Sequence, residues 1–275
     1  MLPSRPVRGA AELAESRITA RESPWLTDAM LLNVVEAGTG DRIAVLLHGM
    51  MGSAESWHRV VPVLVDRGYR VLALDLPGHG LSPRDAQLTI DSAAVAVVET
   101  LARHLAPRSD ATRVPLAAAI GHSFGATVLA AAAPRLAPAL AVYVDAALAL
   151  QGGQDRAALV SQYEHDRRAR MSPAALRLAR PFYSVADAEV EARAAERFDA
   201  ATAASVSCGA DGHWTAAPGS IVVRAEPSAW VTDEDARRFE HDGVTVRSIP
   251  GAAHTVWYSH FEVFTAALPE LFGSR

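Results

Sequence analysis

Short apolar runs rich in Val, Ile and Leu alternate along this chain with longer amphipathic stretches. Parallel strands that crossover helices bury on both faces have this pattern, because neither of their faces meets water. The alternation therefore predicts an α/β fold with a mostly parallel central sheet and flanking helices. The expected strands are 30–36, 42–47, 69–74, 115–120, 140–144, 221–224 and 244–249. Helices are expected to begin near Ser56, near Ile90, just after Ser123, near Thr232 and near Phe261.

The first two expected strands are joined by the short segment Ala37-Gly38-Thr39-Gly40. A turn of this composition permits antiparallel pairing of the strands on either side. We therefore expect the sheet to open with a hairpin.

One stretch, residues 147–218, breaks the alternation. It holds no convincing strand, only Ala-, Arg- and Glu-rich segments with helical periodicity, such as 155–170 and 172–179. A chain of 275 residues is long enough for one core plus an insertion. We therefore expect a core of residues 28–146 and 219–275, with 147–218 inserted as a helical cap. Residues 1–27 lack the apolar core of a secretory signal and are expected to form a tail or a short covering segment.

Charge and cysteine content narrow the possible partners. The 26 basic and 31 acidic residues give a net charge of −5, and no basic run forms the stripe that nucleic acid requires.

The longest apolar stretch, 136–150, is interrupted by Pro138 and Asp145 and is too short to span a bilayer. Cys208, the single cysteine, excludes an internal disulfide, and no histidine or carboxylate pair has convincing metal-ligand spacing. We expect a cytoplasmic protein that acts on a small molecule without cofactor or metal; the sequence does not indicate the oligomeric state.

The segment around Ser123 carries the strongest chemical signal. An apolar strand is followed by Gly121-His122-Ser123-Phe124-Gly125 and then by an Ala-rich helix start. A serine at a strained corner between strand and helix exposes its hydroxyl, and flanking glycines let the neighbouring backbone approach closely. Ser123 is therefore the predicted nucleophile; the alternative is a simple structural turn.

Four segments, read together, resemble the α/β-hydrolase family in its serine-nucleophile branch, over about residues 31–272. They are His48-Gly49-Met50-Met51-Gly52 with Trp57, 75–82, 121–125, and Pro250-Gly251-Ala252-Ala253-His254. The resemblance implies a structural role for His48 and for the 75–82 turn. It also disfavours dehalogenases and epoxide hydrolases, which carry aspartate where Ser123 stands.

Acyl transfer needs a second backbone donor beside the nucleophile turn. The Gly-rich loop that leaves strand 42–47 supplies the candidate, the Met50 N–H, which we pair with the Phe124 N–H as the oxyanion hole. The general base is expected to be His254, because it follows the last apolar run in a loop before the final helix, where the family holds its histidine.

The acid of the triad is less directly indicated. The family commonly places it after the strand before the last one, but Ser228 occupies that position here. Some branches place it one strand earlier, where strand 140–144 ends in Asp145. Asp145 is the leading candidate, although aspartate at that strand end also occurs as a structural residue. Glu226 is the alternative acid.

These features predict a serine hydrolase that acts on a hydrophobic carboxylic ester or lactone through a Ser-His-Asp triad and an acyl-enzyme. Met51, Trp257 and Tyr183 are expected to line the substrate pocket, and we interpret Arg167, Arg168, Arg170 and Arg177 as a solvated helix face rather than a carboxylate clamp. Fold alone does not decide chemistry. A non-hydrolytic enzyme, either a lyase or a natural-product tailoring enzyme, and a small-molecule receptor therefore remain as alternatives.

Overall fold

The computed structural model describes residues 30–105 and 115–273, so the expected tail at 1–27 lies outside the described residues. Its central sheet has seven strands in the order β1-β3-β2-β4-β5-β8-β9, all parallel except β1. These strands are β1 (Val34–Ala37), β2 (Arg42–Leu47), β3 (Tyr69–Leu74), β4 (Leu116–His122), β5 (Ala141–Val144), β8 (Ile221–Glu226) and β9 (Thr245–Pro250). The predicted α/β class and its mostly parallel sheet are confirmed.

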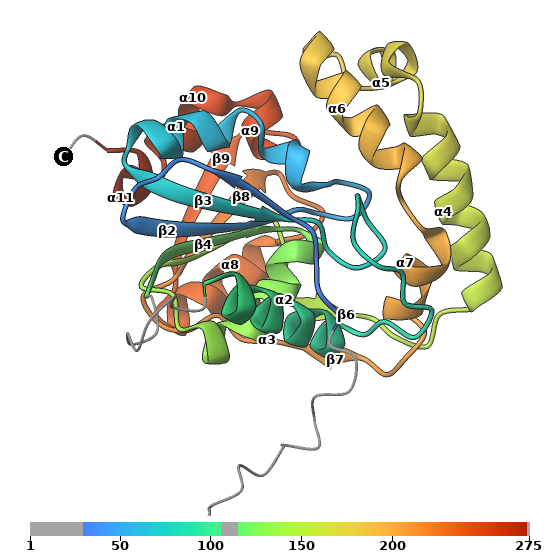
Figure 1. Ribbon diagram of the computed structural model, residues 1–275, viewed down its shortest axis with the longest axis horizontal. Helices are drawn as coiled ribbons and strands as arrows, with labels where there is room; N and C mark the ends of the chain where they lie inside the picture. The colour runs from blue at the N-terminus through green and yellow to red at the C-terminus, as the bar shows by residue number, and fades with distance from the viewer. Residues whose placement is uncertain (1–29, 106–114, 274–275) are drawn as a thin grey trace, which may run out of the picture.

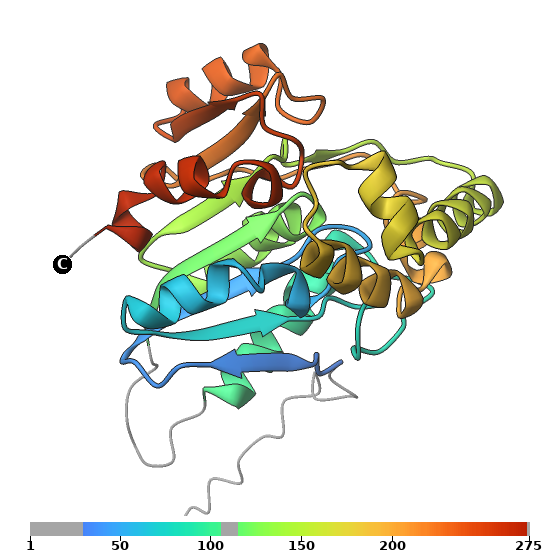
Figure 2. The ribbon, with the colours of Figure 1, turned by 90° about the horizontal axis from the view of Figure 1, so that it is seen from above.

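Helices cover both faces of this sheet (Figures 1 and 2). One face carries α1 (Val60–Asp66), α9 (Val256–Ser259), α10 (Phe261–Ala266) and α11 (Pro269–Phe272); the other carries α2 (Ile90–His104), α3 (Phe124–Leu136) and α8 (Asp233–His241). Successive β2 side chains alternate between the two apolar cores: Val45 and Leu47 point into one, and Ala44 and Leu46 into the other. A strand buried in this way must be apolar at every position, which explains the continuous runs in the sequence. None of the described helices has the length and apolarity needed to cross a bilayer.

The expected opening hairpin is wrong. β1 pairs with β3, and β3 in turn separates β1 from β2. The joining loop instead crosses the start of β3, where a Cβ on Gly40 would lie 2.0 Å from the Gly68 carbonyl oxygen and one on Gly38 2.4 Å from that of Tyr69. The glycines are therefore required by a close backbone crossing rather than by a hairpin turn.

The segment between β5 and β8 holds α4 (Arg156–Arg170), α5 (Pro173–Ala179), α6 (Val185–Glu196) and α7 (Ala200–Val206). We call residues 147–218 the cap segment; it lies beside the carboxyl ends of the parallel strands (Figure 1). The expectation of no strand here needs correction, because β6 (Ala149–Leu150) and β7 (Gly212–His213) pair at its base. α7 also packs on the core: the Thr202 hydroxyl accepts from the Asp85 N–H at 3.0 Å, and the Asp199 N–H donates to Gly78 at 2.8 Å.

Candidate active site

Ser123 stands at a sharp corner between β4 and α3. Its backbone has φ 51° and ψ −118°, a conformation that a side chain with a Cβ rarely adopts. The corner is held by the Ser123 N–H, which donates to the Val144 carbonyl at 2.9 Å, and the serine side chain remains partly exposed. Strain of this kind persists where the surrounding structure fixes it, as at many reactive serines.

The two glycines of the Gly-x-Ser-x-Gly turn are required by space. A Cβ on Gly121 would lie 2.4 Å from the Gly125 carbonyl oxygen, and one on Gly125 would lie 2.4 Å from the carbonyl oxygens of both Leu47 and His48. The sequence motif thus reflects close contact of three backbone segments: β2, the turn itself and the start of α3.

His254 and Asp145 meet at the carboxyl edge of the sheet. Asp145 follows β5 and is buried, and its Oδ2 lies 2.7 Å from His254 Nδ1. Its Oδ1 accepts from the Ser228 hydroxyl at 2.7 Å and from the Ala225 N–H at 3.1 Å. Ser228, which occupies the family's more common acid position, therefore supports the carboxylate of Asp145 instead of replacing it.

Glu226, the alternative acid, lies elsewhere. Its carboxylate accepts from Arg224 at 3.2 Å, is 45% exposed and does not line the active-site cavity. Of the two candidate acids, the structure brings only Asp145 to His254.

His122 fixes the loop that carries His254. Its Nε2 lies 3.0 Å from the His254 carbonyl oxygen, so this nitrogen must carry the hydrogen and donate. Burial lowers the pKa of His122 well below its usual value, and the nearby His254 ring lowers it further. His122 is thus neutral, and through this hydrogen bond it joins the Gly-x-Ser-x-Gly turn to the loop that carries His254.

Two more buried histidines support the Gly-rich loop after β2. His48 Nδ1 donates to the Gly49 carbonyl at 2.8 Å while its Nε2 accepts from the Leu76 N–H at 2.9 Å. His79 Nε2 accepts from the Met51 N–H at 3.2 Å. Burial lowers the pKa of both rings, that of His79 to about 3. These contacts show the structural role of His48 and of the 75–82 turn.

The two expected oxyanion donors line one cavity with Ser123. Among the described residues, neither the Met50 N–H nor the Phe124 N–H donates to a protein acceptor. The Phe124 N–H belongs to the first turn of α3, whose dipole favours negative charge at that end. Both donors are free to meet an anion in the cavity.

The cavity has a volume of about 660 Å³ and lies between the sheet edge and the cap segment. Ser123, His254 and Asp145 all line it, as do the three expected pocket residues Met51, Trp257 and Tyr183. Several lining residues were not predicted from the sequence: His122, Tyr163, Asp166, Arg180, Glu191 and Trp230. Only the tertiary structure reveals them, because they come from five separate segments of the chain. The described residues bring together no group of three or more potential metal ligands.

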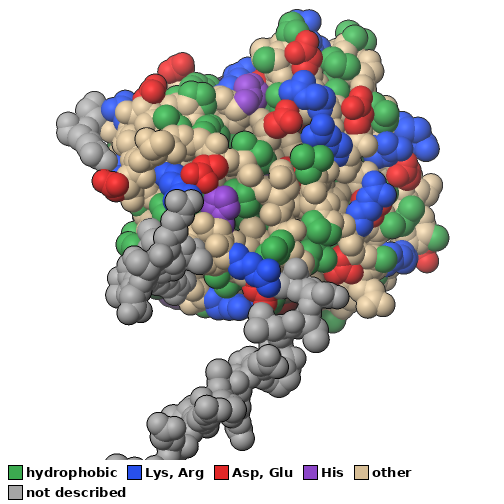
Figure 3. All heavy atoms as spheres, viewed as in Figure 1, with side chains coloured by type: hydrophobic (Ala, Val, Ile, Leu, Met, Phe, Trp, Pro, Cys, Tyr) green, Lys and Arg blue, Asp and Glu red, His purple; other side chains and the backbone are tan. Residues whose placement is uncertain are grey.

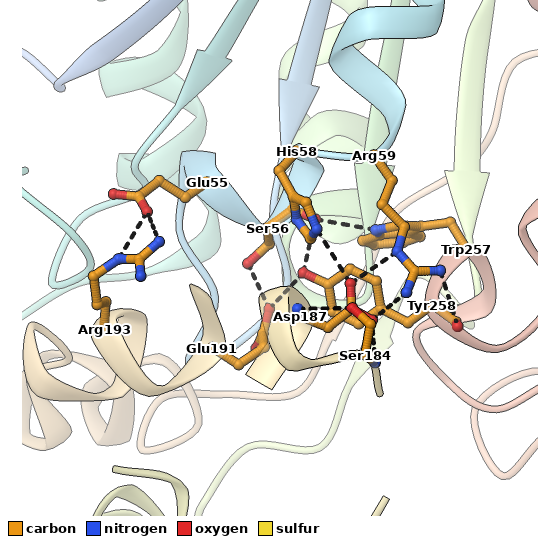
Figure 4. A network of polar contacts seen from close by, with 10 residues as sticks. All are labelled: Glu55, Ser56, His58, Arg59, Ser184, Asp187, Glu191, Arg193, Trp257 and Tyr258. Atoms are coloured by element: carbon orange, nitrogen blue, oxygen red, sulfur yellow. Dashed lines mark hydrogen bonds and ion pairs between the residues drawn. The ribbon is translucent and has the colours of Figure 1, made fainter. Parts of the chain in front are cut away.

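The cap segment is joined to the core by a polar network on α6 (Figure 4). Asp187 accepts from Arg59 Nε at 2.8 Å and lies 3.2 Å from His58 Nε2. One turn later, Glu191 Oε1 accepts from the hydroxyls of Ser56 at 2.8 Å and of Tyr258 at 3.0 Å.

The interpretation of the α4 arginines as a solvated face needs correction for one of them. Arg168 is 65% exposed, but Arg170 is only 18% exposed, lines the cavity and donates to Glu191 Oε2 at 2.9 Å. It lies at the end of α4, where the helix meets α6. The packing between helices that buries Arg170 cannot be read from the charge pattern of α4 alone.

Comparison with known proteins decides the family. A model described as the alpha/beta hydrolase family matches residues 44–267. The chain belongs to the alpha/beta hydrolase family. This alpha/beta hydrolase is similar to a thermophilic esterase from Thermogutta terrifontis, with a TM-score of 0.65 and 19% identity over 87% of this chain and 92% of that one. This similarity shows a shared fold and no more.

Curated relatives of this alpha/beta hydrolase include hydrolases of several types. Lipase LipV of Mycobacterium tuberculosis is 38% identical over 121 residues, which are 43% of this chain and 42% of that protein. Epoxide hydrolase A of the same organism is 35% identical over 104 residues, 38% of this chain and 31% of that protein. The matched regions thus span less than half the length of these relatives.

Proposed function

We propose that the protein is a serine hydrolase of hydrophobic carboxylic esters or lactones, with Ser123, His254 and Asp145 as its catalytic triad. The observation that carries this proposal is the 2.7 Å pair between His254 Nδ1 and Asp145 Oδ2, in the same cavity as the strained Ser123. Ser123 also separates this chain, by resemblance, from the epoxide hydrolases that use aspartate at the same position.

In the proposed mechanism, His254 Nε2 removes the proton from the Ser123 hydroxyl as Oγ attacks the acyl carbon. Asp145 holds the Nδ1–H tautomer, which leaves Nε2 free to accept, and stabilises the imidazolium that forms. His254 then gives the proton to the leaving alkoxide. In the second half of the reaction, His254 takes a proton from water as the water attacks the acyl-enzyme. The proton then returns to Ser123 Oγ as the carboxylic acid is released.

The Met50 and Phe124 N–H groups are proposed to hold the oxyanion of both tetrahedral intermediates. Each such donor typically contributes about 3 kcal/mol of transition-state stabilisation. Met51, Tyr183 and the buried Trp257 form part of an apolar wall, which suits an acyl group with a hydrophobic body.

The experiment compares wild type with Ser123→Ala on a graded panel of p-nitrophenyl esters and lactones. Ser123→Ala should abolish turnover while circular dichroism stays unchanged. A variant as active as wild type would remove Ser123 from the mechanism. A wild type inert on the whole panel, yet active on a cyanohydrin or polyketide-like substrate, would favour a non-hydrolytic enzyme.

A matched pair of variants tests the acid. Asp145→Ala should lower kcat by roughly a thousandfold or more, because the imidazolium loses its stabilising charge and its tautomer is no longer fixed. Glu226→Ala should change kcat by less than about twofold, since Glu226 is half-exposed and paired with Arg224. The reverse ranking would transfer the role to Glu226.

A further inference from the structure

Two guanidinium groups stand in the wall that the cap segment gives to the active-site cavity. Arg170 ends α4, and Arg180 follows α5. Both also line an adjoining cavity of about 460 Å³ between α4 and α5, and Met51 and Asp166 are common to the two cavities. The arginines therefore lie at the boundary between the cavity that contains Ser123 and a second cavity between α4 and α5.

Arg170 is fixed in place with donor capacity to spare. Its Nη2 donates to Glu191 Oε2, and the other oxygen of Glu191 is occupied by Ser56 and Tyr258 (Figure 4). Glu191 is therefore a positioning residue that fixes the guanidinium of Arg170 by this hydrogen bond. Among the described residues, the Nη1 group of Arg170 has no acceptor, and its Nε is buried without one.

Arg180 has fewer polar contacts with the rest of the described protein than Arg170 has. Within residues 30–105 and 115–273, no carboxylate forms an ion pair with it, and no acceptor takes a hydrogen bond from its side chain. Its guanidinium lies over the ring of Tyr183, 5.6 Å from the centroid, which holds it at the cavity wall. Half-buried and unpaired, it presents a full positive charge to whatever enters.

Of the residues that the structure describes, three acidic ones line the active-site cavity: Asp145, which pairs with His254, Glu191, which pairs with Arg170, and Asp166, which also lines the adjoining cavity. Asp166 lies one turn before Arg170 on α4, and its two carboxylate oxygens accept from the Gln162 amide at 3.0 and 3.1 Å. It forms no ion pair of 4.0 Å or less with either arginine among the described residues. The face of the cap segment visible in Figure 3 otherwise carries charges of both signs.

We propose that Arg170 and Arg180 form a carboxylate subsite, so that the substrate is a monoester whose acyl body ends in a second, free carboxylate. The inference rests on the proposed function and specifies its substrate class. A planar guanidinium matches a carboxylate by two parallel hydrogen bonds, and removal from bulk water strengthens them. The apolar wall beside Ser123 holds the acyl body, and the arginines hold its far end.

The test uses p-nitrophenyl monoesters of dicarboxylic acids of graded length, each paired with the p-nitrophenyl ester of the simple acid of equal length. At the fitting length, wild type should favour the anionic ester in kcat/KM. Arg180→Met should lower that preference by about tenfold to a hundredfold, chiefly through KM, because a charge-assisted hydrogen bond is lost. Arg180→Lys should restore part of it.

The matched control is Arg177→Met, on α5 three residues before Arg180 but exposed and outside both cavities, which should leave the preference unchanged. Calorimetric titration of the dicarboxylate product into Ser123→Ala and Ser123→Ala/Arg180→Met gives a readout that needs no turnover. Tighter binding to the first variant supports the subsite.

Failure of the subsite and failure of the hydrolase are distinguishable. If neutral esters are hydrolysed in a Ser123-dependent way but Arg180→Met affects both substrates equally, the subsite is overturned and the hydrolase stands. If no ester is hydrolysed, the proposed function fails, and the calorimetric comparison alone decides the subsite.

Discussion

At the scale of single residues, Ser228 links Asp145, the proposed acid, to the loop after β8. Its hydroxyl donates to Asp145 Oδ1 at 2.7 Å, and its oxygen accepts from the backbone N–H groups of Trp230 and Val231 at 2.9 and 3.0 Å. Asp145 thus has one oxygen for His254 and the other for Ser228 and Ala225. This division fixes which oxygen faces the histidine.

Replacing Ser228 by Ala should therefore reduce activity without removing the acid. The carboxylate of Asp145 loses one donor to Oδ1 and gains rotational freedom, so we expect kcat/KM for a short p-nitrophenyl ester to fall by about tenfold, the cost of one hydrogen bond to a charged group. Ser228→Thr keeps the hydroxyl and should stay within about threefold of wild type. Full activity in Ser228→Ala would show that the Ala225 N–H alone positions Asp145.

Sequence reasoning located residues whose position depends on one strand end, and missed those whose position depends on packing between segments. Ser123, Asp145 and His254 each follow a strand, and parallel strands bring their carboxyl ends to one edge. The sequence places Arg170 on a solvated helix face with Arg167 and Arg168, whereas in the structure it is only 18% exposed and donates to Glu191 on α6. Nothing within α4 signals that contact.

At the scale of elements, α6 is held to the core by two acidic side chains one turn apart. Glu191 contacts Ser56 and Tyr258, while Asp187 contacts Arg59 and His58 (Figure 4). Burial would raise the pKa of the Asp187 carboxyl, but hydrogen bonds from His58 and Ser184 and the charge of Arg59 lower it to about 2. The charged form of Asp187 therefore stabilises the docked helix.

We expect Asp187→Asn to lower the free energy of unfolding at pH 7.5 by about 2 to 3 kcal/mol, since an ion pair that is buried on one side is broken. The sign follows from the lowered pKa: the contribution is complete above the ordinary carboxyl pKa of about 4 and is lost as the pH falls towards 2. Urea unfolding measures the change. Glu189→Gln, exposed on the same helix, should shift it by less than about 0.5 kcal/mol.

The boundaries of most strands were predictable, but their neighbours were not. β2 and β3 begin and end where their apolar runs predict, because the fully buried positions 43–47 and 71–74 are apolar without a break. The partner of β1 was wrong because the same glycines serve a hairpin turn or a close crossing equally well. β6 and β7 have two residues each, which is too short to show the apolar–polar alternation by which a strand is recognised in a sequence.

At the scale of the whole molecule, three buried histidines should make the stability of the fold depend on pH. His48, His79 and His122 lie within the core, and burial is the largest cause of the lowered pKa of each ring. All three use a ring nitrogen as a hydrogen-bond partner of a loop after β2, β3 or β9. Protonation of any of them places a charge in the buried region near the Ser123 turn.

We therefore predict that stability falls steeply below pH 6.5. In the unfolded chain each of these histidines binds a proton near that pH, whereas in the folded protein the pKa is lower, for His79 about 3, so folding opposes protonation. His79 alone should remove about 1.4 kcal/mol per pH unit as the pH falls from 6.5 towards 3, and His48 and His122, whose folded pKa values are also lowered, should act in the same direction. Urea unfolding at pH 7.5, 6.5 and 5.5 measures the slope.

The variant that tests the origin of this slope is His79→Gln, whose amide keeps an acceptor for the Met51 N–H but does not titrate. It should be less stable than wild type at pH 7.5. Its free energy of unfolding should also fall less steeply on acidification, because unfolding of the variant takes up about one proton fewer. His213→Gln, exposed on β7, is the control and should keep the wild-type slope. A wild type equally stable at pH 7.5 and 5.5 would mean that these rings ionise within the fold, and the buried, neutral hydrogen-bond pattern around Ser123 would have to be revised.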